Sequence, residues 1–244
     1  MIKELLASLK MRGALEIFEQ IDHLKERDQF LIALLKGEIE HKEARSNKRR
    51  LFQAKFPTEK EWRDIDSSLN PKIDFSKVEK LGNGAFIQQK ENLCLMGQQG
   101  TGKTHSLTAL GRDLCRKGQT VKFYTAATLV NLLEEAKANH TLVKIMQSLG
   151  KPDLLIIDEL GFVPFSESGA RLLFDVFASR YEKGSIAVST NLSFDKWVQV
   201  FGTPELTAAL VDRFTHKCLI FNYQGRSVRF LDATKRKEEL KKAS

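Results

Sequence analysis

Cysteine is scarce in this 244-residue sequence, and no paired cysteine motif occurs. The three cysteines, Cys94, Cys115 and Cys218, lie far apart and have neither CxxC spacing nor nearby pairs of histidines. This pattern excludes a disulfide framework and a structural zinc site. We therefore expect three buried thiols.

Long hydrophobic runs are also lacking. No stretch approaches the roughly 18 consecutive apolar residues that a membrane span requires. The N-terminal sequence, MIKELLASLKMRG, alternates charged residues with leucines and lacks the apolar block of a signal peptide. With 42% apolar and 29% charged residues, the composition is that of a soluble globular protein. We expect a cytoplasmic protein with no membrane partner.

Acidic residues are too few to balance the basic ones in two segments. Residues 41–60 carry seven Lys or Arg and two Glu, and residues 235–244 carry five and two. The remaining 27 basic and 27 acidic residues cancel, so these segments account for the whole net charge of +8. Each segment is either a solvated charged helix or a contact with nucleic acid. The candidate DNA contacts are Lys42, Arg45, Lys48, Arg49 and Arg50.

The first 40 residues have the apolar spacing of helices. From Ile2 to about Ile39 this spacing predicts two or three short helices, and we expect Gly13 and Gly37 to interrupt them. Pro57 ends the helical pattern.

A polar connection with a turn at Asn70–Pro71 then leads into a second region, so the domain boundary is expected between residues 57 and 70. The predicted division has three parts. They are an N-terminal helical domain with the basic segment at residues 1–60, an ATP-binding domain at 61–234 and a basic tail at 235–244.

Five short apolar, β-branched runs follow, with helical patterns between them. Strands that alternate with helices predict an α/β fold, in which a five-stranded parallel sheet is covered by helices on both faces. The predicted strands are Asn92–Met96, Val121–Thr125, Asp153–Asp158, Ile186–Thr190 and Lys217–Phe221.

A phosphate-binding loop, GQQGTGKT, lies directly after the first strand and before a helix that begins near Lys103. Its glycines allow backbone N–H groups to converge on phosphate oxygens, and the helix N-terminus adds partial positive charge. Lys103 is expected to reach the β and γ phosphates and Thr104 to ligate Mg²⁺. The loop therefore predicts binding of ATP or ADP with Mg²⁺. The expected nucleotide-binding residues are Gly97, Gln98, Gln99, Gly100, Thr101, Gly102, Lys103, Thr104 and His105.

The third predicted strand ends in two carboxylates, Asp158 and Glu159. Open α/β sheets bind their ligands at the carboxyl ends of the strands. Asp158 is therefore a candidate Mg²⁺ ligand, and Glu159 is a candidate to polarise the attacking water for hydrolysis.

Two further polar residues are candidates. Asn191 ends the fourth strand, which is expected to lie between the first and third strands, and it is either a partner of the γ-phosphate and the attacking water or a turn residue. Arg213 lies near the end of a predicted helix. It either stabilises charge on a phosphoryl group of a neighbouring subunit or forms a local ion pair with Asp212.

Four segments together resemble the IstB family. These proteins are ATP-binding helpers encoded beside a transposase in bacterial insertion sequences, and they are similar to the helicase loader DnaC and, more remotely, to the initiator DnaA. The resemblance extends from about residue 3 to residue 231. The segments are GQQGTGKTH, LLIIDELGFVPFSESGARLLFDVFASRYEKGS, VSTNLSFDKWVQVFGTPELTAALVDRFTH and YQGRSVRF.

The resemblance implies an AAA+ ATPase that assembles as a ring or spiral of identical subunits on duplex DNA, remodels the DNA, and recruits and stimulates a partner transposase. It implies a DNA-associated protein of the bacterial cytoplasm. Lys103, Glu159, Asn191 as γ-phosphate sensor and Arg213 as an arginine finger would be catalytic, with each site completed between subunits. The chain stops soon after the fifth strand, so no helical lid domain is expected.

Two alternatives remain open at this point. One is a DnaC-like replicative helicase loader, whose N-terminal helices grip a helicase and whose nucleic acid is single-stranded. The other is a switch that binds ATP and barely hydrolyses it, so that the nucleotide serves only to hold the oligomer together.

Overall fold

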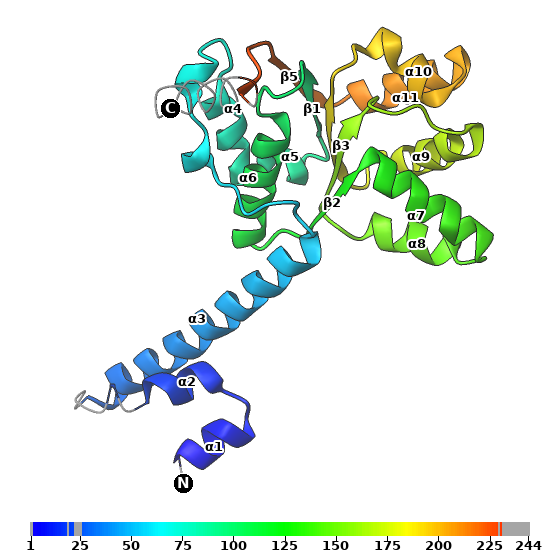
Figure 1. Ribbon diagram of the computed structural model, residues 1–244. Coiled ribbons are helices and arrows are strands. Elements are labelled where there is room, and N and C mark those ends of the chain that lie inside the picture. The colour runs from blue at the N-terminus through cyan, green and yellow to red at the C-terminus, as the bar shows by residue number, and fades with distance from the viewer. Residues whose placement is uncertain (1, 19, 22–25, 229, 231–244) are drawn as a thin grey trace, which may run out of the picture. The chain divides into compact units, whose positions relative to one another are not determined.

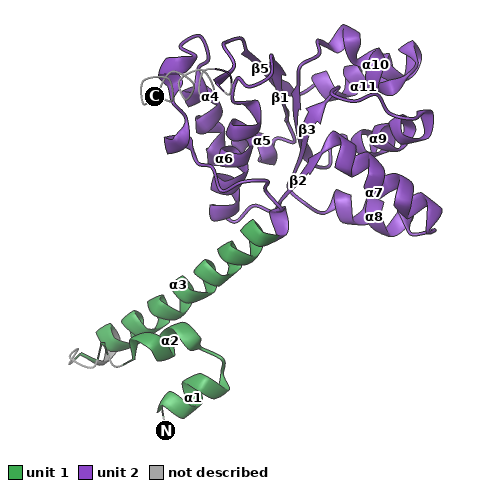
Figure 2. Cartoon of the chain, viewed as in Figure 1, with its two compact units in different colours: residues 1–52 green, residues 53–244 purple. Residues whose placement is uncertain are grey.

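The computed structural model describes residues 2–18, 20–21, 26–228 and 230. The chain divides into two compact units, residues 1–52 and 53–244 (Figure 2). Each unit is described by itself below. The predicted basic tail at residues 235–244 lies outside the described residues.

The first unit is built from α1 (Ile2–Ser8), α2 (Arg12–Ile17) and most of α3 (Arg27–Ala54), whose last turn passes the unit boundary. Its apolar core is small. Leu6, Ala14 and Leu34, one from each helix, are its buried members.

Gly13 and Gly37 lie inside α2 and α3, so the expectation that they interrupt helices was wrong. A Cβ atom on Gly13 would lie 2.4 Å from the carbonyl oxygen of Gly37. A Cβ atom on Gly37 would lie 2.3 Å from Cδ1 of Ile17. Both glycines therefore allow α2 and α3 to approach closely, and this packing outweighs the weak helix propensity of glycine.

The second unit contains a five-stranded parallel sheet, as predicted (Figure 1). The strand order is β2-β3-β4-β1-β5. As also predicted, β4 lies between β1 and β3. Because all strands are parallel, the sheet has an amino edge, where the strands begin, and a carboxyl edge, where they end. The strands are β1 (Asn92–Gly97), β2 (Val121–Thr125), β3 (Leu154–Leu160), β4 (Ser185–Thr190) and β5 (Cys218–Tyr223).

Helices cover both faces of this sheet (Figure 1). α6 (Lys103–Arg116) packs against β1 to β4 on one face, and α7 (Ala126–Ala138) and α9 (Glu167–Arg180) pack on the other. A large apolar cluster fills the space between the second set of helices and the sheet. The further helices of this layer are α8 (Leu142–Gly150), η4 (Phe194–Trp197), α10 (Val198–Phe201) and α11 (Pro204–Thr215).

Short helices precede β1. They are η1 (Trp62–Asp64), η2 (Ser67–Leu69), α4 (Phe75–Lys80), η3 (Leu81–Asn83) and α5 (Ala85–Gln88). Within the described residues, no helical lid domain follows β5.

No helix in the described part of the chain has the length and apolar character needed to cross a membrane.

Candidate nucleotide-binding site

The predicted phosphate loop connects the buried strand β1 to α6, which begins at Lys103. Gly100 and Gly102 have φ angles of +74° and +99°, a conformation that residues with a side chain rarely adopt. Gly102 is also the N-cap of α6. The loop therefore turns its backbone towards a helix N-terminus, which is an arrangement that binds phosphate.

Lys103 is held by the loop itself. Its ammonium group donates hydrogen bonds to the carbonyl oxygens of Gly97 at 2.7 Å and Gln98 at 2.6 Å. The Thr101 hydroxyl donates to the same Gln98 oxygen at 2.8 Å. Lys103 is 8% exposed, so its charge lies in the concave side of the loop, where it suits a bound polyphosphate.

Asp158 lies at the carboxyl end of β3 and is buried. Its Oδ1 atom accepts a hydrogen bond from the Thr104 hydroxyl at 3.2 Å and a second one from the Ser189 hydroxyl. Carboxylate and hydroxyl oxygens close to phosphate groups are the ligands that Mg²⁺ uses in nucleotide sites. The residues present therefore fit a Mg²⁺ ion held by Thr104 and Asp158.

Glu159 has a left-handed backbone with φ of +60°, in an irregular stretch where the register between β3 and β4 shifts. Two hydroxyls of β4 hold this stretch. The Ser189 hydroxyl accepts a hydrogen bond from the Glu159 N–H at 3.0 Å, and the Thr190 hydroxyl donates to the Leu160 carbonyl at 2.8 Å. Ser189 thus contacts both acidic residues, a role that the sequence did not predict.

Asn191 is exposed and directly follows β4. Its Oδ1 atom lies 3.6 Å from the position that a Cβ on Gly161 would take, beside the chain that leaves Glu159. The structure therefore brings Thr104, Asp158, Glu159 and Asn191 together at the carboxyl edge.

Arg213 lies elsewhere. It is exposed in the last turn of α11, and the Asn92 side chain donates to the carbonyl of the next residue, Phe214, at 3.0 Å. Asn92 is the first residue of β1, so Arg213 lies at the amino edge. The length of β1, about 20 Å, separates it from the phosphate loop of its own chain.

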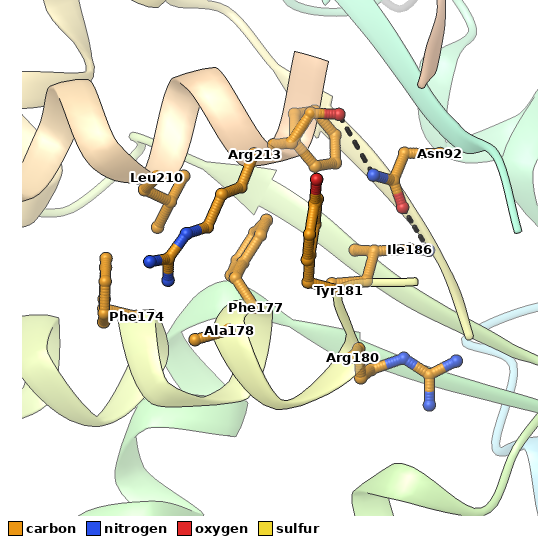
Figure 3. A pocket seen from close by; sticks show the side chains of 10 residues that line it. Asn92, Phe174, Phe177, Ala178, Arg180, Tyr181, Ile186, Leu210 and Arg213 are labelled. Atoms are coloured by element: carbon orange, nitrogen blue, oxygen red, sulfur yellow. Dashed lines mark hydrogen bonds between the residues drawn. The ribbon is translucent and has the colours of Figure 1, made fainter. Parts of the chain in front are cut away.

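Two arginines line a cavity at the amino edge, and they point in different directions (Figure 3). Arg180 is 1% exposed, and its guanidinium group donates to the carbonyls of Leu149, Pro152 and Ser185 at 2.7 to 2.9 Å. Burial lowers the pKa of Arg180 to about 10. No hydrogen bond or ion pair involves the Arg213 side chain within the described residues.

A second cavity, of about 310 Å³, adjoins the phosphate loop and is lined by residues between 58 and 75 and by Val228. Buried Asn70 accepts a hydrogen bond from the Arg226 N–H at 2.7 Å and donates to the Arg226 carbonyl at 3.0 Å. The Val228 N–H donates to the Gly100 carbonyl at 2.9 Å. Asn70 thus holds the segment after β5, and Val228 joins that segment to the loop. The sequence position of Asn70 indicated only a turn.

His105 was predicted to bind nucleotide. Its Nε2 atom lies 2.8 Å from the Glu61 carbonyl oxygen, and burial lowers its pKa. The Glu61 carboxylate pairs with Arg116, and with Arg112 at 3.6 Å. These contacts join α6 to the segment before η1. Gln98 and Gln99, which were also predicted to bind nucleotide, are exposed in the loop.

The predicted DNA contacts all lie on α3. Lys42, Arg45, Lys48 and Arg49 are exposed. Arg50 is half-buried, and its Nη1 atom donates to the Ser46 hydroxyl at 2.8 Å. Four of the five basic residues are therefore exposed on α3, and Arg50 differs from them because it is half-buried.

The chain is similar to known ATP-binding proteins. The family model for IstB-like ATP-binding proteins matches residues 6–237. The chain is 35% identical to an ATP-binding protein of insertion sequence IS5376 from Geobacillus stearothermophilus, over 87% of this chain and 85% of that one. It is 34% identical to an ATP-binding protein of IS21 from Pseudomonas aeruginosa, over 85% and 78%.

Among solved structures, the fold is similar to that of AMPPCP-bound DnaA from Aquifex aeolicus. The TM-score is 0.59 and the sequence identity 17%, over 76% of this chain and 56% of that one.

Proposed function

The chain belongs to the family of IstB-like ATP-binding proteins, and from this premise we propose that it is a Mg²⁺-dependent ATPase that assembles on duplex DNA, remodels it, and recruits and stimulates a partner transposase. The observation that carries the proposal is the 3.2 Å contact between Thr104, at the end of the phosphate loop, and Asp158 on β3. It joins a phosphate site and a metal site, as hydrolysis of ATP requires.

Each residue at the carboxyl edge has a chemical role in this proposal. The loop N–H groups and Lys103 bind the phosphates, and Thr104 and Asp158 hold Mg²⁺. Bound Mg²⁺ would supply positive charge to the phosphate oxygens. Glu159 orients the attacking water and accepts its proton. Asn191 donates a hydrogen bond to the γ-phosphate.

Arg213 completes the site from a second subunit. It lies at the amino edge of its own chain and has no side-chain partner among the described residues. In a ring or spiral with head-to-tail contacts, one surface of each subunit meets a different surface of the next. In the proposed assembly, Arg213 of one subunit contacts the phosphates of its neighbour, where it stabilises the charge of the transition state.

The DNA part of the proposal is supported by the exposed basic residues of α3 and by the insertion sequences named in the two relatives. Contacts between these cations and phosphates need no particular base sequence. Each neutralised phosphate makes the affinity more dependent on salt.

The test is a binding titration of the full chain with ATP on duplex and single-stranded DNA of equal length. We expect tighter binding to the duplex, with an affinity that falls steeply as salt rises. Absence of duplex binding, or an affinity for the duplex that does not change with salt concentration, would contradict the proposal. A preference for single strands would favour the helicase-loader alternative.

A further inference from the structure

α3 presents basic residues and an aromatic residue on one side. At 3.6 residues per turn, Lys42, Arg45, Lys48, Arg49 and Phe52 fall within an arc of about 120°. We call these five residues the basic-aromatic face. They extend over about 15 Å of the helix axis.

Phe52 is the unusual member of this face. Its side chain is 84% exposed, the highest value among the large apolar residues in the described chain. Four residues later, Phe56 is half-buried and packs against Phe123 with ring centroids 6.1 Å apart. An exposed phenylalanine ring can bury its apolar area against another molecule, which stabilises a complex by about 25 cal/mol per Å² of apolar area removed from water.

Three of the four cations of the face have no ion pair within the described residues and are free to meet another molecule. Lys42 pairs with Glu38 at 3.3 Å, and Glu38 is itself buried and accepts a hydrogen bond from the Ala14 N–H. Within the described residues, Arg45 and Lys48 have no ion pair. The same is true of Arg49. A surface with several unpaired cations is complementary to a polyanion.

We propose that the basic-aromatic face lies in the major groove of duplex DNA, with the cations on phosphates and Phe52 against the base edges. This inference rests on the proposed function, since it specifies how the same partner is held. The major groove is about 12 Å wide and admits an α-helix. Lys48 lies on one side of Phe52 around the helix and Arg49 on the other, so cations flank the ring and can reach both phosphate strands.

An apolar ring at the base edges has one specific partner, the C5-methyl group of thymine. Uracil lacks this methyl group and keeps every charge and hydrogen-bonding group of thymine. Exchange of thymine for uracil in the duplex therefore removes only the contact that Phe52 is proposed to make.

The first test compares binding to one duplex at several salt concentrations with ATP present. Phe52→Ala should lower the affinity about tenfold, because it removes the burial of one aromatic side chain, and should leave the slope of log affinity against log salt unchanged, because the ring contacts no phosphate. Arg49→Ala should instead reduce that slope by about one. Ile39→Ala is the matched control, because Ile39 is 54% exposed on α3 and lies about 140° around the helix from Phe52.

The second test repeats the titration with the uracil duplex. Wild type should bind thymine DNA several-fold more tightly than uracil DNA, and Phe52→Ala should bind both equally. Equal affinities of Phe52→Ala and wild type, or an equal loss in Ile39→Ala, would overturn the inference. So would a loss seen only with single strands. A wild-type chain that binds no DNA would instead overturn the proposed function.

Discussion

Polar side chains have different surroundings at the two edges of the sheet. At the carboxyl edge, the reactive side chains are placed by neighbours, since Thr104 and Ser189 both contact Asp158. At the amino edge, Arg180 is buried and bonded to backbone carbonyls, while Arg213 beside it is exposed and has no partner in the described chain. One chain thus holds two acidic residues and the phosphate loop in place at one edge and, within the described residues, leaves an exposed arginine without a partner at the other.

This difference separates residues that hold the fold from residues that are available for chemistry. The Arg180 guanidinium group is buried, and its two terminal nitrogens donate to backbone carbonyls, so a substrate cannot reach it. An exposed one without acceptors is available to a neighbouring molecule. The substitutions below test whether the two edges differ in this way.

Glu159→Gln should have the largest effect on turnover. Loss of the base should reduce ATP hydrolysis by about 10² to 10⁴-fold and leave ATP affinity nearly unchanged, as steady-state kinetics and equilibrium binding would show. Glu182→Gln is a matched control, because Glu182 has a similar φ of +58° and is exposed between α9 and β4. Equal turnover in Glu159→Gln and wild type would favour the switch that hardly hydrolyses ATP.

Arg180→Met should have the next largest effect, on stability. It leaves the buried carbonyls of Leu149, Pro152 and Ser185 without a donor, which should lower the free energy of unfolding by about 3 kcal/mol. Arg213→Met, in the same cavity wall, should change it by less than about 0.5 kcal/mol. Denaturant titrations of both variants measure this contrast, and equal losses would remove the distinction between the two arginines.

Ser189→Ala should have a smaller effect, confined to the carboxyl edge. The hydroxyl that contacts Asp158 and the Glu159 N–H is lost, so turnover should fall about 10- to 100-fold, with little change in nucleotide affinity. Ser185→Ala makes the same change at the other end of β4, where the buried hydroxyl has no partner in the described chain. A similar loss of turnover in both variants would contradict the positioning role of Ser189.

The sequence predicts the sheet because its signals are local. An apolar run, a glycine loop and a terminal acid pair mark β1, the phosphate loop and the end of β3 within a few residues each. The predicted strand ends differ from the observed ones by at most two residues.

Contacts between distant segments have no such signal. Asn70 bonds to Arg226, 156 positions away, and nothing near Asn70 in the sequence indicates that partner. Gly13 and Gly37 were interpreted as helix breaks. They allow α2 and α3 to pack closely, and the residues next to either glycine do not indicate this contact between two segments. Ser189 was missed because a serine in a strand is common, and only the register with β3 brings it to Asp158.

In the proposed function, each ATP site is divided between the carboxyl edge of one subunit and the amino edge of the next. Arg213→Ala should bind ATP like wild type and, like Glu159→Gln, hydrolyse little of it. An equal mixture of these two inactive chains, assembled on duplex DNA with ATP, is the most direct test. We expect about a quarter of the sites to combine an intact Glu159 with an intact neighbouring Arg213, so that hydrolysis returns. A mixture as inactive as its components, or an Arg213→Ala chain with wild-type turnover, would contradict this division of the site.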